Sequence, residues 1–212
     1  MKAPTFISNT TDDKHCVQAS VGMVLGYFLP ERKFSMAQLE KLTGFVEGKG
    51  AWEMEELLNY DRLGLEAVVI VNSSYEEFAK RGFDYLAEVM GSDIAQWAET
   101  QTGDIELEKK RAAEVAKKDI HEYRVPTRED IRRLLAEGWL VMLETNARKL
   151  NYQAGFTGHR VLVYAADVTG VTMHDPGRPA HQSRFVDWEL LEQAWADPNE
   201  NAKTLIAVRK RN

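Results

Sequence analysis

A nearly all-apolar stretch from Val17 to Phe28, ended by Pro30, is the feature that most constrains how this chain can fold. Its apolar side chains fall on every side of a helix rather than along one stripe, which is typical of a helix buried in the core. Small residues near its start would let other elements approach the backbone closely. We therefore expect the rest of the chain to be built around this helix.

The only cysteine of the chain, Cys16, immediately precedes this stretch. Asp12 and Asp13 are the expected N-caps, so the thiol would lie in the first helical turn. Free backbone N–H groups and the positive end of the helix dipole favour a thiolate there. Such surroundings can lower a cysteine pKa from about 8.5 to roughly 3.5–7.5. An inert buried thiol is the alternative for this residue alone, whereas a suitable histidine elsewhere would favour a nucleophile.

Length and composition restrict the classes of partner and site. A chain of 212 residues suits one domain, with or without an insertion. The formal net charge of −6 argues against a nucleic-acid backbone as the main partner. One cysteine leaves no internal disulfide and no paired-cysteine zinc site. Residues 1–14 lack an apolar core and no stretch reaches the roughly 18 apolar residues of a membrane span, so we expect no signal peptide, no membrane partner and a cytoplasmic location.

Helical patterns fill most of the chain before residue 138, and strand patterns dominate after it. Helices are expected at 35–41, 52–63, 131–137 and 187–195, and strands at 65–71, 139–144, 159–166, 171–174 and 205–209. Residues 73–121 have the texture of a charged, all-helical block. The expected architecture is therefore α+β, with N-terminal helices and a C-terminal antiparallel sheet, in a single domain over 1–212 that carries a helical insertion at 73–121.

A histidine and an aspartate are expected to meet at the open end of one hairpin. Gly158-His159-Arg160 begins a strand, Asp175-Pro176-Gly177 follows its partner strand, and the turn lies near residues 167–170. Asp175 would accept the Nδ1–H of His159, leaving Nε2 to take a proton from Cys16. A purely structural role is the alternative for His159 by itself. The combination with Asp175 and Cys16 favours a catalytic triad.

These motifs, taken in order, resemble those of the papain-like bacteriocin-processing (C39-like) peptidases and their stand-alone relatives. The matching patterns are Cys16-x-x-Ala19-x-x-x-Met23-x-Leu25, Gly158-His159-x-Val161-x-Val163, Asp175-Pro176 and a helix ending at Trp195. The resemblance extends over most of the chain. It implies a papain-like cysteine proteinase fold, a bacterial thiol hydrolase acting on peptide-like amides or thioesters, a Cys16–His159–Asp175 triad and no cofactor.

Two positions depart from the pattern of that family. Val17 stands where the family has a glycine after its cysteine, and no glutamine precedes Cys16 to complete the oxyanion hole. Loss of one oxyanion donor typically costs about 10²–10³ in rate. The nearest substitutes are the side-chain amide of Asn9 and the hydroxyls of Thr10 and Thr11. We therefore predict that Asn9 or Thr10 directs a donor toward the space above Cys16.

Two other functions would use the same fold. An acyltransferase would pass the acyl group from the triad to an amine, and a peptide-binding module would recognise a peptide without cutting it. The expected partner is in each case a peptide or an acyl donor, and the sequence leaves the oligomeric state open. The 73–121 insertion either only packs on the core or forms a lid that selects acyl donors.

The remaining candidate residues are assigned structural or surface roles. His15 is expected on the surface, and His174 is expected to face away from Asp175. His174, His181 and Asp175 have no recognised ligand spacing, so no metal site is expected. Trp188 and Trp195 are read as core anchors. The basic runs 109–111 and 209–211 are read as solvated surface.

Overall fold

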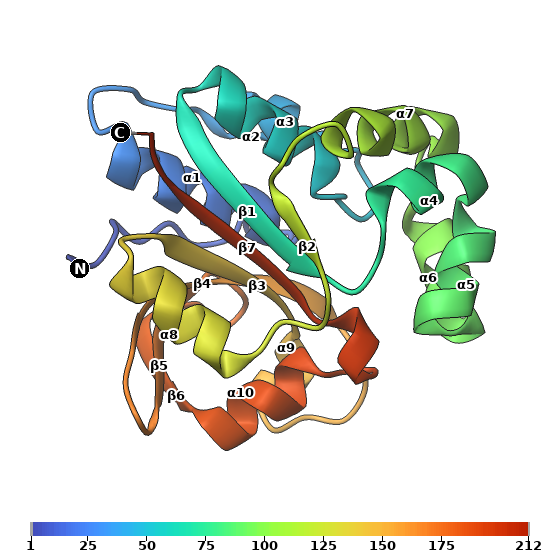
Figure 1. The fold of residues 1–212 in the computed structure, drawn as a ribbon. Coiled ribbons are helices and arrows are strands. Elements are labelled where there is room, and N and C mark those ends of the chain that lie inside the picture. The colour runs from blue at the N-terminus through green and yellow to red at the C-terminus, as the bar shows by residue number, and fades with distance from the viewer. Residues whose placement is uncertain (1, 212) are drawn as a thin grey trace.

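The computed structural model describes residues 2–211 and has helices on both faces of one seven-stranded sheet (Figure 1). The helices are α1 (Cys16–Phe28), α2 (Met36–Thr43), α3 (Met54–Arg62), α4 (Tyr75–Arg81), α5 (Phe83–Met90), α6 (Ser92–Gln101), α7 (Ile105–Val115), α8 (Arg128–Ala136), α9 (Ala147–Leu150), α10 (Trp188–Trp195) and the 3-10 helix η1 (Glu200–Ala202). The strands are β1 (Leu65–Val71), β2 (His121–Tyr123), β3 (Leu140–Asn146), β4 (Gly158–Ala166), β5 (Gly170–Asp175), β6 (His181–Asp187) and β7 (Thr204–Lys210). The predicted α+β class is confirmed.

The strand order is β2-β1-β7-β3-β4-β5-β6. Neighbouring strands are antiparallel except β1 and β2, which are parallel. β2 and β6 were not expected from the sequence. β2 is only three residues long, and most side chains of β6 are partly or fully exposed, so neither has a clear apolar alternation.

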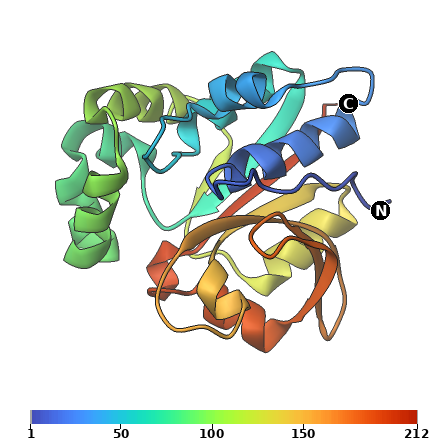
Figure 2. The same ribbon diagram turned by 180° about the vertical axis from the view of Figure 1, so that it is seen from behind.

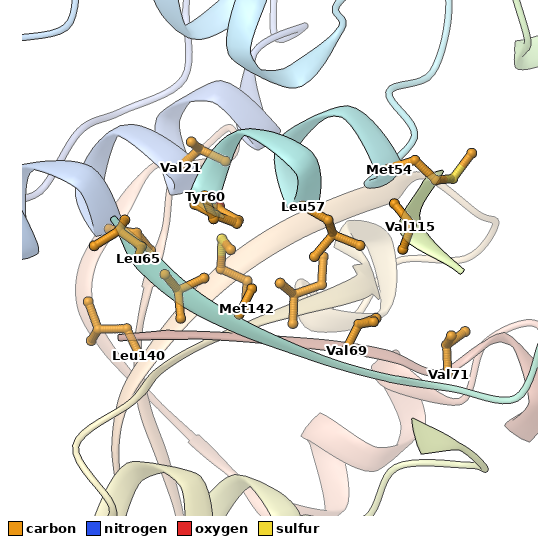
Figure 3. Close-up of a cluster of buried hydrophobic side chains, with 14 of the residues drawn as sticks. Val21, Met54, Leu57, Tyr60, Leu65, Val69, Val71, Val115, Leu140 and Met142 are labelled. Atoms are coloured by element: carbon orange, nitrogen blue, oxygen red, sulfur yellow. The ribbon is translucent and has the colours of Figure 1, made fainter. Parts of the chain in front are cut away.

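Alternate residues of each strand serve two separate cores. On β3, Leu140 and Met142 face the side covered by α1 and α3, where Figure 3 shows them packed below Leu57 and Tyr60. Val141 and Leu143 of the same strand face α8 and α10. This two-sided burial explains why the central strands are continuous apolar runs rather than alternating ones.

Helix α1 has the buried position that its composition predicts. Val24 and Leu25 are 0% exposed, and a Cβ at Gly22 would lie 3.0 Å from the Leu39 side chain of α2. The predicted capping by Asp12 or Asp13 is wrong. Asp12 accepts from nearby Thr10 and Asp13 has a φ of 61°, and neither carboxylate caps the helix. The orphan N–H at the helix start is instead bound by a residue further upstream, described below.

The helical block predicted as an insertion, residues 73–121 and called the insertion below, forms the connection between β1 and β2. It contains α4 to α7, drawn in green at one side of the sheet in Figure 1. α7 packs on α3 and α4, whereas α5 packs on α6. The block is therefore joined to the core through α4 and α7, and the end of α5 accepts hydrogen bonds from Asn199 and Asn201 at η1. Within residues 2–211, no helix combines the length and apolar character needed to cross a bilayer.

Candidate active site

The β4–β5 hairpin brings His159 and Asp175 together, as the sequence predicts. The turn is held by Asp167, whose carboxylate accepts from the backbone N–H of Thr169 at 2.7 Å and of Gly170 at 3.1 Å. At the open end, Nε2 of His159 lies 2.7 Å from Oδ1 of Asp175. The predicted use of Nδ1 for this contact is wrong. Nε2 lies farther from the histidine backbone and spans the gap between the two strands, which leaves Nδ1 as the free ring nitrogen.

Asp175 is 2% exposed, and each of its oxygens has partners. Oδ1 also accepts from the N–H of Gly177 at 3.0 Å, and Oδ2 accepts from Nη1 of Arg184 at 3.0 Å. Burial raises the pKa of Asp175, but the hydrogen bonds from His159 and Gly177 and the charge of Arg184 outweigh it and lower the pKa. Asp175 is therefore held as a carboxylate beside the imidazole.

Gly177 is required by close approach to this pair. A Cβ at this position would lie 2.9 Å from Cε1 of His159 and 3.0 Å from Oδ1 of Asp175. Real Cβ atoms do not come this near, so any other residue would displace the ring or the loop. Close packing against His159 and Asp175 therefore requires glycine at the third position of the Asp-Pro-Gly motif.

Cys16 is the first residue of α1 and is half-buried. Burial raises the pKa of its thiol, but the hydrogen bond and positive charge of His159, with the backbone N–H of Arg160, outweigh burial and lower the pKa. Burial lowers the pKa of His159, while its hydrogen bonds to Asp175 and Cys16 raise that pKa to about 10. Both directions favour a thiolate paired with an imidazolium, which is the reactive form of a cysteine nucleophile.

Asn9 connects the segment before α1 to both sides of the site. Its Oδ1 accepts from the N–H of His15 at 2.7 Å, which caps the helix start, and its Nδ2 donates to Asp13 at 2.8 Å. Its backbone N–H donates to the carbonyl of Pro176 at 2.8 Å. Figure 2 shows this N-terminal segment running between α1 and the hairpin. Asn9 thus ties the Cys16 helix to the loop after Asp175, and its role as an oxyanion donor stays a prediction.

Thr10, the second oxyanion candidate, is engaged with its neighbours. Its hydroxyl lies 2.7 Å from Nδ1 of His15 and contacts the carboxylate of Asp12.

The expected surface position of His15 is wrong. His15 is 7% exposed, stacks on Phe45 with ring centroids 4.6 Å apart and places Nε2 2.9 Å from Glu40. The packing of α2 against the first turn of α1 buries it.

His174 points away from the pair formed by His159 and Asp175, as expected for its neighbour on a strand. Its Nε2 lies 2.9 Å from the carbonyl of Pro4, and its Nδ1 accepts from the N–H of Ser183 at 3.1 Å. Over residues 2–211, no group of three or more histidine, cysteine, aspartate and glutamate side chains is arranged to hold a metal ion.

A buried ion cluster lies next to His159 and was not foreseen. Arg160 is 1% exposed, and its Nη1 lies 2.6 Å from each carboxylate oxygen of Glu56 on α3. Its Nε donates to Glu144 on β3 at 2.5 Å. Burial outweighs the attraction of Arg160 and raises the pKa of Glu56 to about 7. A sequence signal existed, since an arginine in an apolar strand requires buried partners, but those partners are remote in the chain.

A cavity of about 380 Å³ opens beside His159. One wall comes from the sheet and the segment before β4, and the other from α5 and α6 of the insertion. The sheet wall includes Glu144, Thr145, Phe156, Gly158 and His159, and the insertion wall includes Leu86, Met90, Asp93, Ile94, Trp97 and Ala98. The insertion therefore lies beside the candidate site, and packing on the far side of the core is excluded.

Comparison with known proteins gives similarity at the level of structure. No family model and no curated protein sequence matches the chain. The peptidase domain of Streptococcus ComA, a bifunctional ABC transporter involved in quorum sensing, has 12% identity and a TM-score of 0.47, covering 96% of each chain. A Bacillus anthracis protein described as a C39-like peptidase has 15% identity and a TM-score of 0.50, covering 98% of this chain and 96% of that one. By the second likeness, the chain has the α+β, papain-like fold of a C39-like peptidase.

Proposed function

We propose that this protein is a cysteine-dependent hydrolase that cleaves a peptide-like amide or thioester. The observation that carries the proposal is the 2.7 Å contact of His159 with Asp175, together with a cysteine at a helix N-terminus whose thiol pKa is lowered by that histidine. The lowered pKa of Cys16 and the raised pKa of His159 support an activated nucleophile rather than an inert thiol. The peptidase-like fold supports the same reading.

The proposed reaction proceeds by acyl transfer through the thiol. The Cys16 thiolate attacks the substrate carbonyl, forming the S–C bond, and the backbone N–H of Cys16 stabilises the developing oxyanion. His159 gives its Nδ1 proton to the leaving group as the carbonyl–nitrogen or carbonyl–sulfur bond breaks. Water then attacks the thioester while His159 accepts its proton, which releases the acid and the thiolate. Asp175 orients the ring through Nε2 throughout.

The substrate class follows from the site and the charge of the chain. If an amine replaced water as the acyl acceptor, the same triad would act as an acyltransferase. The shape of the pocket decides whether water or an amine reaches the acyl-enzyme. A module that only binds peptide needs no depressed thiol pKa, so the state of Cys16 favours the enzyme. The net charge of −6 supports a peptide or acyl donor as partner and not a nucleic acid.

Alkylation by iodoacetamide tests the proposal directly because Cys16 is the only thiol. We expect rapid labelling of the folded protein at about pH 6, where an ordinary thiol of pKa near 8.5 reacts slowly. The same protein unfolded in urea is the matched control and should label slowly at that pH. Equal rates for folded and unfolded protein would contradict the proposal. Hydrolysis of a fluorogenic peptide library, lost in Cys16→Ala, would then identify the reaction.

A further inference from the structure

The cavity beside His159 has an exposed aromatic pair at its edge. Trp97 on α6 is 47% exposed and Phe156 before β4 is 41% exposed, and their ring centroids lie 5.6 Å apart in an edge-to-face arrangement. A Cβ on Gly158, next to His159, would lie 3.6 Å from the ring of Trp97. Two large aromatic side chains are thus partly open to solvent beside Gly158, the chain neighbour of His159. Such exposure is typical of a binding surface.

Behind this pair the cavity is apolar. Leu86, Met90 and Ile94 of the insertion line it, together with Val71 at the end of β1. Its volume of about 380 Å³ falls within the range of pockets that hold organic ligands. A flexible methionine beside branched side chains also adapts to differently shaped apolar groups. The interior therefore suits a bulky aliphatic or aromatic group.

Apart from His159, the charged residues of the cavity are all carboxylates. Glu53, Asp93, Glu144 and Asp197 line it, and no lysine or arginine of residues 2–211 does. Glu144 is bound to Arg160, and Asp197 lies 3.6 Å from Nζ of Lys149. Glu53 accepts from the hydroxyl of Tyr75 at 2.6 Å, whereas Asp93 forms no ion pair with any described residue. The lining therefore offers the carboxylate of Asp93 to a cation supplied by the occupant.

We propose that the cavity selects a peptide segment that places a bulky apolar side chain against Trp97 and a basic side chain near Asp93. This specificity rests on the proposed function, since His159 lines the same cavity. Charge decides the chemistry of the occupant. A fatty-acyl group carried on an anionic phosphate-bearing donor would meet the carboxylates of the lining and be repelled. The helical insertion would thereby form the side of the site that selects the substrate, in addition to packing on the core.

Binding to the non-reactive Cys16→Ala protein tests this selection separately from catalysis. The probe is a fluorescein-labelled alanine nonapeptide with a central Phe-Lys pair, compared with its Ala-Lys and Phe-Glu versions by fluorescence anisotropy. We expect each single change to weaken binding by about tenfold, the loss typical of one apolar or charged contact. Equal binding of the three peptides, including no binding up to about 1 mM, would overturn the proposal. Tighter binding of palmitoyl-coenzyme A than of the Phe-Lys peptide would also overturn it.

Matched variants within the insertion locate the contact. In the Cys16→Ala background, Trp97→Ala should abolish the preference for Phe over Ala, and Asp93→Asn the preference for Lys over Glu. Leu107→Ala on α7 and Glu99→Gln on α6 are exposed residues outside the cavity and should change neither. Preferences that survive Trp97→Ala and Asp93→Asn would contradict the assignment. Peptide selection without rapid alkylation of Cys16 would refute only the proposed hydrolysis, so the two failures are distinguishable.

Discussion

His159 has two ring nitrogens, and the structure decides which neighbour each one serves. Nε2 contacts Asp175, so Nδ1 is the nitrogen available to Cys16. The sequence predicts the three residues but not this orientation. A hairpin brings two strand ends together whatever the side-chain torsion angles are, whereas the choice of nitrogen depends on the direction in which the ring projects.

The first prediction concerns the ionisation of Cys16. His159→Ala should raise the pH at which the thiolate forms, because burial, the largest influence, raises the pKa of Cys16 and His159 supplies the strongest opposing contact. Titration of the ultraviolet thiolate absorbance should place the wild-type midpoint below about 8.5 and the variant midpoint above it. His181→Ala is the control, since His181 is not among the groups that shift this pKa. A variant midpoint at or below the wild-type value would refute the coupling.

The second prediction concerns Gly177. Gly177→Ala introduces a Cβ 2.9 Å from His159, which should displace the ring from Asp175 and slow alkylation and turnover by tenfold or more, since about 1 Å of misplacement can cost roughly 10²-fold. Gly26→Ala on α1 is the matched control because its added Cβ meets nothing within 4 Å. Both variants should unfold cooperatively. Full activity in Gly177→Ala would show that the loop can give way without disturbing the pair.

At the scale of elements, the buried cluster joins α3, β3 and β4 through one guanidinium. Arg160→Met would leave Glu56 and Glu144 without their cation, and breaking a buried ion pair costs about 3–5 kcal/mol. Urea unfolding should register this loss as a lower midpoint with an unchanged slope. Arg81→Met, which removes an exposed pair with Glu88, should leave the midpoint nearly unchanged. Similar midpoints for the two variants would mean that the buried cluster adds little to the free energy of unfolding.

The insertion is anchored to the core by the buried side of α4. Phe78 is 3% exposed and packs on Trp52 with ring centroids 5.1 Å apart. Phe78→Ala should lower the unfolding free energy by about 3–5 kcal/mol, the usual cost of removing a buried phenylalanine, and should expose residues 73–121 to limited proteolysis. Leu107→Ala on the exposed side of α7 is the comparison. Wild-type resistance of the insertion in Phe78→Ala would mean that its other contacts with the core hold it without this side chain.

For the whole molecule, the last strand lies inside the sheet and joins its two parts. β7 pairs with both β1 and β3, and Leu205, Ile206, Ala207 and Val208 are each at most 1% exposed. Removing residues 204–211 should therefore abolish cooperative unfolding, because both neighbouring strands lose their partner and both cores lose a layer. Thermal unfolding followed by circular dichroism measures this. Removal of residues 210–211 alone should preserve the transition, and a cooperative transition in the longer truncation would contradict the prediction.

The local elements that hold the candidate site could be predicted from the sequence. The apolar run from Val17 to Phe28 forms a buried helix, and the β4–β5 hairpin brings His159 beside Asp175. These features depend on periodicity and on a short turn, which act between residues close in the chain. Capping of α8 by Thr127, with its reciprocal bond to Asp130, was predictable for the same reason.

Features that join distant segments were decided only by the tertiary structure. Asn9 caps α1 in place of the adjacent aspartates, Arg160 finds Glu56 on α3, and Trp97 of the insertion lies beside Gly158. Each contact depends on how packed elements align in space, and local propensity carries no information about that alignment. The helix, the hairpin and the three residues of the candidate triad were predictable from the sequence. The tertiary structure determined the triad's hydrogen-bonding arrangement, the buried ions beside it and the cavity that faces it, because these depend on packing between segments far apart in the chain.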